Sequence, residues 1–535
     1  MSPRRRPDRE YDGALEAMTA EELRGFVRDL LERLDDDQGG VLADSLIARA
    51  AKGTAGWKPA GPGRGLAGEV ERYVEAARRV GHGDPAEVDE YLRRGSRSFL
   101  ADEPSTARAV FDALLPPIAD GEIHLGQHEM VDEVLQVSLG DCAARYVASV
   151  YLTTAPKDRA RAVHQAIDAV QGLSSIWEPV GQMERVATGP LPELDAFLPR
   201  WVRYLERRPT PAEAWESGRD HWLREAVRRL EGIAGLERIA RKTRKPETVR
   251  AWCDAVVEER DWGEALRAYD AATRLVRGSD WRGMFLDGAA LAARELGRPD
   301  ARRLHAAWLG APSLVRLLRW LGAGSPPATA LVKRARQAIR RCPKKAGRQL
   351  GLLYILTGNV VAAAELLEAA PGLGWSSEDH PGHVVFPAFA ALLAGRARAK
   401  LGPQFFARLQ EAPRDPFDTA IGEDGDVERP TLSTPSVGDL IATAGSGAGI
   451  DAKSRDAMLQ AMRRATTKRV EGIVGNKRRD HYWHAATLLA CCLEAARAIG
   501  DEREVREWVD AVRQGYSRHY AFQEEYRRAL ASMAS

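Results

Sequence analysis

The stretch Asp261-Trp262-x-x-Ala265-Leu266-x-x-Tyr269-x-x-Ala272 decides the expected fold of this chain. Its aromatic, small and large apolar residues recur three or four positions apart, which places them on one face of an α-helix. An acidic residue before the first aromatic one marks the start of that helix. The spacing predicts a helix that packs inside a stack of helix pairs.

A second stretch repeats this spacing about ninety residues later, with Gly351, Tyr354, Gly358-Asn359, Ala363 and Ala370. Gly351 allows two helices to approach closely, and Gly358-Asn359 makes the turn between them. The two stretches resemble tetratricopeptide-type repeats, a resemblance that implies binding surfaces rather than reaction centres. Pairs between them, such as 280–298, fit the consensus poorly. We therefore expect an irregular α-solenoid of helix pairs over residues 69–410.

Composition supports an all-α, soluble chain. Among 535 residues, alanine, arginine, leucine and glutamate dominate and β-branched residues are sparse, which favours helices. The 78 basic and 76 acidic residues leave a formal charge of +2, so no global bias toward nucleic acid or membranes exists. No run of about 20 apolar residues predicts a membrane span, and no apolar run after the basic start predicts a secretory signal. We expect a cytoplasmic protein.

The N-terminal residues 1–51 predict a helical hairpin. Thr19 and Glu22 form a capping box before an amphipathic helix over 19–34. A polar turn over 35–40 precedes a second helix over 41–51, and the Gly/Pro-rich residues 52–68 read as a linker. The hairpin has the size of a small docking module.

Prolines and glycines predict two breaks further along. Turns are expected around five prolines: Pro190, Pro192, Pro199, Pro209 and Pro211. Residues 411–452, with four prolines and the run Gly445-Ser446-Gly447-Ala448-Gly449, predict a flexible loop or linker. Residues 453–535 then predict a helical block.

The C-terminal block has its own resemblance. The helix Lys477-Arg478-Arg479-x-x-Tyr482-x-x-Ala485-Ala486, with Tyr520-Ala521-Phe522-Gln523, resembles the helical tail of some bacterial SWIM-type zinc-finger proteins. The cysteine and histidine ligands that define that finger are absent, and no Cys-x-x-Cys pair occurs in the chain. The resemblance implies a shared helical module and carries no zinc assignment.

His124-x-x-x-His128 is the nearest approach to a metal site. On a helix the two imidazoles would share a face, with Glu129 and Asp132 nearby. However, the order of residues is not that of zinc metalloproteases, and Gly126 between the histidines favours a helix that begins only after it. A solvated or capping face is the alternative. Motifs for nucleophiles and phosphate loops are absent, so we expect neither an enzyme nor a cofactor.

A basic helix over 332–345 offers a nucleic-acid surface as an alternative function. Its stripe consists of Lys333, Arg336, Arg340 and Lys344, widened by Arg341 and Lys345. Such a stripe could follow phosphates, although no aromatic residues interleave with the charges to stack on bases. The competing interpretation is an outer helix face whose cations pair with acids on neighbouring helices.

Aromatic residues of the middle third give the leading hypothesis. Trp262, Tyr269, Trp281 and Tyr354 either fill the seams between helix pairs or line a groove as contact anchors. The sequence favours a scaffold or adaptor that binds one or more proteins, as part of a bacterial multi-protein assembly. Nucleic-acid binding is second, and a metal-dependent enzyme around His124 and His128 is third.

Overall fold

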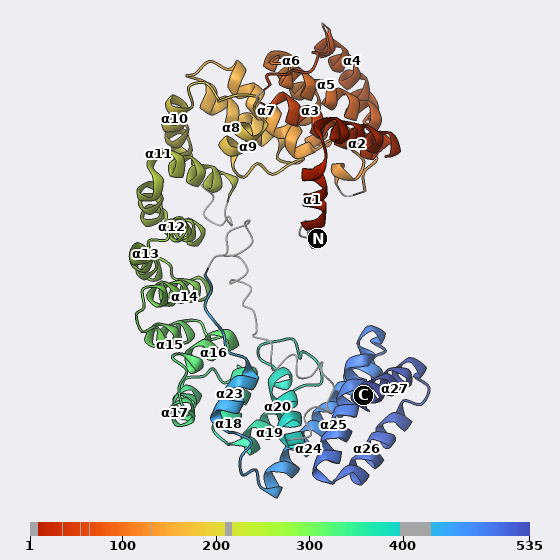
Figure 1. Ribbon diagram of the computed structural model, residues 1–535, viewed down its shortest axis with the longest axis vertical. Coiled ribbons are helices and arrows are strands. Elements are labelled where there is room, and N and C mark those ends of the chain that lie inside the picture. The colour runs from red at the N-terminus through yellow and green to blue at the C-terminus, as the bar shows by residue number, and fades with distance from the viewer. Residues whose placement is uncertain are drawn as a thin grey trace. The chain divides into compact units, whose positions relative to one another are not determined.

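The computed structural model of the chain describes residues 9–34, 36–53, 55–63, 65–128, 130–208, 217–395 and 430–534. These residues form 25 α-helices and a few short 3₁₀ and π turns, without a strand within the described ranges (Figure 1). The all-α prediction is confirmed. The chain divides into two compact units, residues 1–239 and 240–535, so the boundary lies inside the segment 69–410 that the sequence predicts as one domain.

Eleven helices begin in the first unit, and the last of them, α11, crosses the boundary. Their bounds are α1 Arg9–Ala17, α2 Ala20–Arg33, α3 Asp36–Ala51, α4 Leu66–Val80, α5 Pro85–Leu100, α6 Pro104–Ala119, α7 Leu139–Thr153, α8 Arg159–Val170, α9 Pro179–Val186, α10 Leu194–Arg207 and α11 Gly218–Thr243.

The capping box of α2 is present. The Thr19 hydroxyl accepts the Glu22 backbone N–H at 3.2 Å, and the Glu22 carboxylate accepts the Thr19 backbone N–H at 2.7 Å. The Glu22 carboxylate also accepts the Thr19 hydroxyl at 2.7 Å, and the two bonds that it accepts from Thr19 hold the pKa of Glu22 below its ordinary value. The polar turn predicted over 35–40 is wrong for residues 36–40, because α3 begins at Asp36. A β-carbon at Gly40 would lie 3.0 Å from the Arg93 guanidinium of α5, so a tertiary contact replaces the expected turn.

The second unit continues with α12 Pro246–Glu258, α13 Trp262–Leu275, α14 Ser279–Glu295, α15 Ala301–Gly310, α16 Leu314–Gly322, α17 Ala328–Ile339, α18 Gly347–Leu356, α19 Val360–Ala369 and α20 Gly382–Ala394. Beyond the gap it has α23 Val437–Ala444, α24 Ala452–Val470, α25 Tyr482–Ile499, α26 Glu502–Gly515 and α27 Tyr520–Ala534. Each helix from α12 to α20 contacts the next one along the chain. The predicted helix at Lys477–Ala486 begins only at Tyr482, since Lys477 has a positive φ of 55°.

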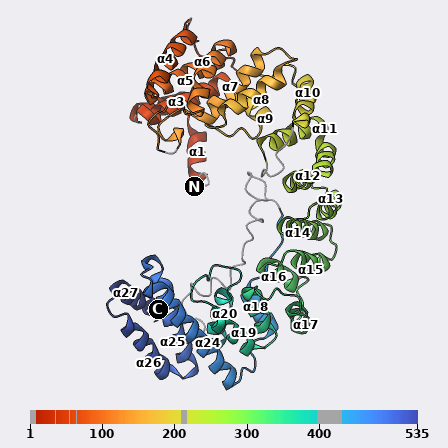
Figure 2. The ribbon, with the colours of Figure 1, turned by 180° about the vertical axis from the view of Figure 1, so that it is seen from behind.

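Residues 437–444 form a helix where the sequence predicts a flexible linker over 411–452. In α23 the Ser436 hydroxyl caps the Asp439 backbone N–H at 3.0 Å, and Val437 and Leu440 are buried. The helix packs on α16, α17 and α18, as both ribbon views show (Figures 1 and 2). Residues 411–429 of that linker lie outside the described residues.

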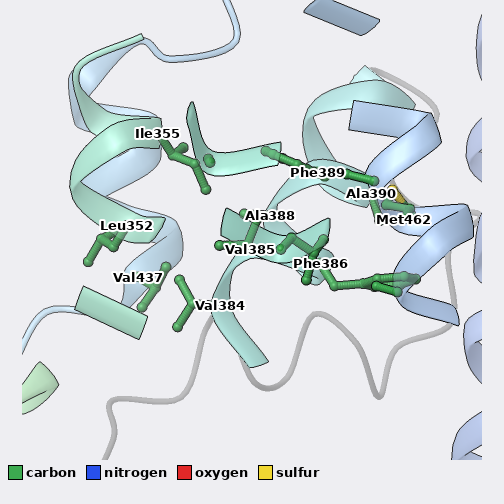
Figure 3. Close-up of a cluster of buried hydrophobic side chains, with 14 of the residues drawn as sticks. Leu352, Ile355, Val384, Val385, Phe386, Ala388, Phe389, Ala390, Val437 and Met462 are labelled. Carbon is green, nitrogen blue, oxygen red and sulfur yellow. The ribbon is translucent and has the colours of Figure 1, made fainter. Parts of the chain in front are cut away.

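One hydrophobic cluster joins most of the second unit. It runs from Ala290 in α14 to Met533 in α27, and Figure 3 shows Val437 of α23 beside Leu352 of α18 and Val384 of α20. Helices α24 and α25 contact α19 and α20, so the block predicted at 453–535 shares its core with the helices before the gap. The C-terminal block is therefore part of the second unit.

Candidate functional site

His124 and His128 do not share a helix face. His124 lies in a short parallel bridge with His82, and Gly126 has a φ of 85°, which a right-handed helix does not allow. The His124 Nδ1 accepts the Gly126 backbone N–H at 3.0 Å. Within the described part of the chain no group of three or more His, Cys, Asp or Glu side chains is placed to hold a metal, and Glu129 lies outside that part. The helical arrangement behind the metal hypothesis is wrong.

Burial keeps the cysteine thiols protonated. All five, Cys142, Cys253, Cys342, Cys491 and Cys492, are free and buried. Loss of hydration raises the pKa of the Cys142 thiol to about 11 and that of Cys492 to about 12. Near neutral pH these groups act as small apolar side chains rather than as nucleophiles.

The four aromatic residues predicted as partner anchors lie in different environments. Tyr269 is only 4% exposed and fills the seam between α13 and α14, where a β-carbon at Gly288 would lie 2.3 Å from its ring. Trp262 and Trp281 are half-buried, and Trp281 stacks on Phe285 with ring centroids 6.4 Å apart. Tyr354 is half-buried against the hydrophobic cluster. Tyr269 therefore fills a seam between helices, which was the alternative to its predicted role as a contact anchor in a groove.

The apolar face of α2 is only partly covered by the described residues: five of its side chains are half-buried and one is exposed. Six apolar side chains share this face, and none of them is buried: Leu23, Phe26, Val27, Leu30, Leu31 and Leu34. Phe26 is 52% exposed. Helix α3 contacts α2 but does not cover the ring. We name these six residues the α2 apolar face.

The basic helix predicted over 332–345 is shorter than expected. Helix α17 ends at Ile339, and the chain turns at Arg340 and Arg341. Pro343 explains this end, because the residue before a proline is disfavoured in a helix. Arg340, Arg341 and Lys344 therefore follow α17 rather than continue its stripe.

The cations of this region nevertheless form one exposed group. We name it the α17 basic surface: Lys333, Arg336, Arg340, Arg341, Lys344 and Lys345. None of the six makes an ion pair with a described acidic residue, so the neighbouring acids expected by the competing interpretation are not found there. Lys333 and Arg336 also line a hollow of about 390 Å³ between α17 and α23.

A second basic site has its cations on two facing helices, and the sequence reading missed it. We name it the α8–α10 cleft. It has a volume of about 730 Å³, and its cations are Lys157, Arg161, Arg200, Arg203, Arg207 and Arg208. The turn predicted around Pro199 concealed it, since α10 runs through this proline. The available signal was the spacing of Arg200, Arg203 and Arg207, three and four residues apart, opposite the buried Phe197, Trp201 and Leu205.

Neither protein-family models nor curated proteins give a match to this chain. No described helix combines the length and the apolar character needed to cross a lipid bilayer. Three surfaces of the described residues are candidates for binding: the α2 apolar face, the α17 basic surface and the α8–α10 cleft.

Proposed function

We propose that this protein is a scaffold or adaptor that binds another protein through the α2 apolar face. One observation carries the proposal: a capped amphipathic helix has no buried residue on its apolar side, and Phe26 on that side is 52% exposed. Burial of a large apolar side chain is worth about 1.5–3 kcal/mol, so Phe26 and the leucines beside it favour association. An amphipathic helix of a partner, laid along α2, would cover the face at the usual spacing of anchors.

The rest of the chain fits a supporting role in this proposal. The consecutive packing of α12 to α20 is consistent with an irregular solenoid of helix pairs, in which each pair stacks on its neighbours. Such stacks offer long surfaces for binding. The assembly we envisage is a bacterial multi-protein complex in the cytoplasm.

A pair of matched variants of α2 tests the proposal. Phe26→Ser with Leu30→Ser removes apolar area, whereas Arg24→Ser with Arg28→Ser makes the same exchange at the same spacing on the polar side. Cross-linking in the source cells followed by mass spectrometry identifies the partner, and titration with the purified partner measures affinity. We expect a loss of at least about 30-fold for the first variant and about twofold or less for the second.

Equal partner binding by the two variants would refute the proposal. Light scattering of the purified chain separates a foreign partner from a second copy. A dimer that Phe26→Ser with Leu30→Ser dissociates would show that the face is a self-association surface instead.

The α17 basic surface supports nucleic-acid binding as a second candidate. The specific observation is that six exposed cations have no acidic partner within the described residues. Binding of single-stranded RNA, measured by fluorescence anisotropy, should weaken steeply with salt. Lys333→Glu with Arg336→Glu should lower the slope of log affinity against log salt by roughly 1.4, at about 0.7 per phosphate contact for a single strand. An unchanged slope contradicts this candidate.

A further inference from the structure

Helix α10 provides one wall of the α8–α10 cleft. Its buried side carries Phe197, Trp201 and Leu205, and this packing turns the opposite side toward the cleft. Five residues of α10 and its C-cap line the cleft: Arg200, Arg203, Tyr204, Arg207 and Arg208. The last four follow Arg200 by three, four, seven and eight positions, a spacing that places all five on one side of the helix. At about 1.5 Å per residue the stripe is roughly 12 Å long.

The N-terminus of α8 provides the other wall. Lys157, Asp158, Ala160 and Arg161 line the cleft from this end. Asp158 occupies the N-cap position, yet its side chain makes no cap hydrogen bond to the first backbone N–H groups of α8. A helix N-terminus carries about half a positive charge, and its open N–H groups are donors for an anion.

The next helix, α9, shows how another side chain of the same unit can bond to the backbone N–H groups at a helix N-terminus. At the N-terminus of α9 the Glu225 carboxylate accepts the backbone N–H of Val180 at 3.1 Å and that of Gly181 at 2.6 Å. A carboxyl group of the same unit thus satisfies the N-terminus of α9, whereas the Asp158 carboxyl group at α8 makes no cap hydrogen bond and pairs with Arg161.

The charge of the cleft is almost entirely of one sign. Among its described lining residues, Asp158 is the one carboxylate against six cations, and it pairs with Arg161 at 3.5 Å. Two of the arginines bond to neutral oxygens: Arg203 donates to the Pro199 carbonyl at 3.2 Å and Arg208 to the Tyr204 hydroxyl at 2.5 Å. Lys157, Arg200 and Arg207 have no ion pair within the described part of the chain. Cations that converge without partners repel one another until an anion binds between them.

The shape of the site selects a compact ligand. The open hollow of about 730 Å³ has a volume within the range of small-molecule sites, roughly 300–1,000 Å³. Its cations line a single hollow, whereas a long nucleic-acid strand is held by cations that continue along its path. Guanidinium groups bind phosphate oxygens in pairs, so several arginines within 12 Å suit several linked phosphates.

We propose that the α8–α10 cleft binds the phosphate chain of a small polyphosphate, either a nucleoside triphosphate or inorganic tripolyphosphate. The α10 arginines and Lys157 hold the phosphate oxygens, and the first N–H groups of α8 complete the site. The half-buried Tyr204 ring stacks on Trp201 with ring centroids 5.8 Å apart and has the Arg208 guanidinium 5.1 Å from its centroid, and its exposed part would contact a base if the ligand carries one. This site is separate from the α2 apolar face and from the α17 basic surface.

Calorimetric titration of the full chain with tripolyphosphate, ATP and AMP, at about 150 mM salt, tests the proposal. We expect binding of the first two and little of AMP. Arg203→Glu with Arg207→Glu should weaken tripolyphosphate binding at least about 100-fold, because two charge-assisted contacts become repulsive. Lys333→Glu with Arg336→Glu changes the charge of the chain by the same amount on the other unit and should alter the affinity by about twofold or less.

Two readouts guard against a folding artefact and separate the sources of phosphate. The single change Arg207→Gln affects an exposed side chain, so it should keep the circular dichroism spectrum while weakening binding about tenfold. Tighter binding of ATP than of tripolyphosphate, lost in Tyr204→Leu, indicates a nucleotide; equal binding indicates the inorganic ligand. Absence of binding to both, equal weakening by the two double variants, or binding only of single-stranded RNA would overturn the proposal.

Discussion

The α17 basic surface and the α8–α10 cleft each carry six cations, yet they present them differently. The first lies on one helix and the turn that follows it, where all six side chains are exposed. The second gathers its cations from two helices around one hollow. The first arrangement suits an extended polyanion and the second a compact one. The number of cations does not distinguish the two surfaces. They differ because a second helix, α8, borders the cleft.

A buried arginine gives the largest expected effect and tests whether the cleft arginines hold the fold together. In the second unit Arg316 donates to Asp287 at 2.7 Å, and both side chains are at most 10% exposed. Asp287→Ala should lower the free energy of unfolding by about 3–5 kcal/mol, because it leaves a buried cation without this carboxylate. Arg207→Gln should change it by less than about 0.5 kcal/mol.

Urea unfolding followed by tryptophan fluorescence measures both variants. If Arg207→Gln proves as costly as Asp287→Ala, the cleft arginines are structural, and the contrast between the two kinds of arginine fails.

The α9 N-terminus offers a pH-dependent version of the comparison, because the carboxyl group that caps it, Glu225, belongs to the same unit. Burial raises the pKa of Glu225 to about 7, against the opposing effect of the two backbone N–H donors and Arg229. The folded chain therefore binds this proton more tightly than the unfolded chain, whose carboxyl has a pKa near 4.3. Stability from this group is greatest below about pH 4.3, falls by up to about 3 kcal/mol as the pH rises to about 7, and is then constant.

Glu225→Gln should flatten that part of the pH profile. Unfolding of the two proteins in urea at several pH values between 5 and 8 provides the measurement. Parallel profiles would show that Glu225 stays ionised throughout, with its charge stabilised by the α9 N-terminus.

The smallest expected effect compares the cations of the α8–α10 cleft with those of the α17 basic surface in the absence of any ligand. Arg203→Glu with Arg207→Glu should raise the melting temperature at about 10 mM salt by roughly 2–4 °C, equivalent to about 1 kcal/mol in a unit of this size, because it relieves repulsion across the cleft. The effect should vanish at about 1 M salt. Lys333→Glu with Arg336→Glu should give a smaller rise, since those cations lie further from facing charges.

Scanning calorimetry at both salt concentrations provides the comparison. A rise of the same size in the two variants would mean that the repulsion comes from the general charge of each unit rather than from the cleft.

Local patterns were predicted well because their causes lie within a few residues. The Thr19–Glu22 capping box and the helix from Trp262 to Leu275 both occur, and each rests on short-range hydrogen bonds and helical periodicity. The α2 apolar face could be read for the same reason. The end of α17 could also be predicted from the sequence, because Pro343 is a local signal for a helix end. The prediction of a helix to residue 345 gave more weight to the spacing of the basic residues than to this proline.

Two errors came from treating proline and glycine as decisive. Pro199 stands inside α10, where the loss of one backbone hydrogen bond is offset by burial of Phe197 and Trp201 on either side of it. The glycine-rich segment around Gly445 follows a helix, α23, whose Val437 and Leu440 enter the core of helices far earlier in the chain. In both places long-range packing outweighs local propensity.

The sequence by itself determined the all-α class, the amphipathic α2 and the basic character of the region after Leu331, because periodicity and composition act along the chain. Only the tertiary structure decided that Tyr269 fills a seam, that α23 returns to α16–α18, and that cations of α8 and α10 face one another. A cleft is a relation between two helices about forty residues apart in the chain. The sequence of either helix alone does not reveal this cleft. The packing of the buried faces of α8 and α10 determines which of their exposed faces lie next to each other.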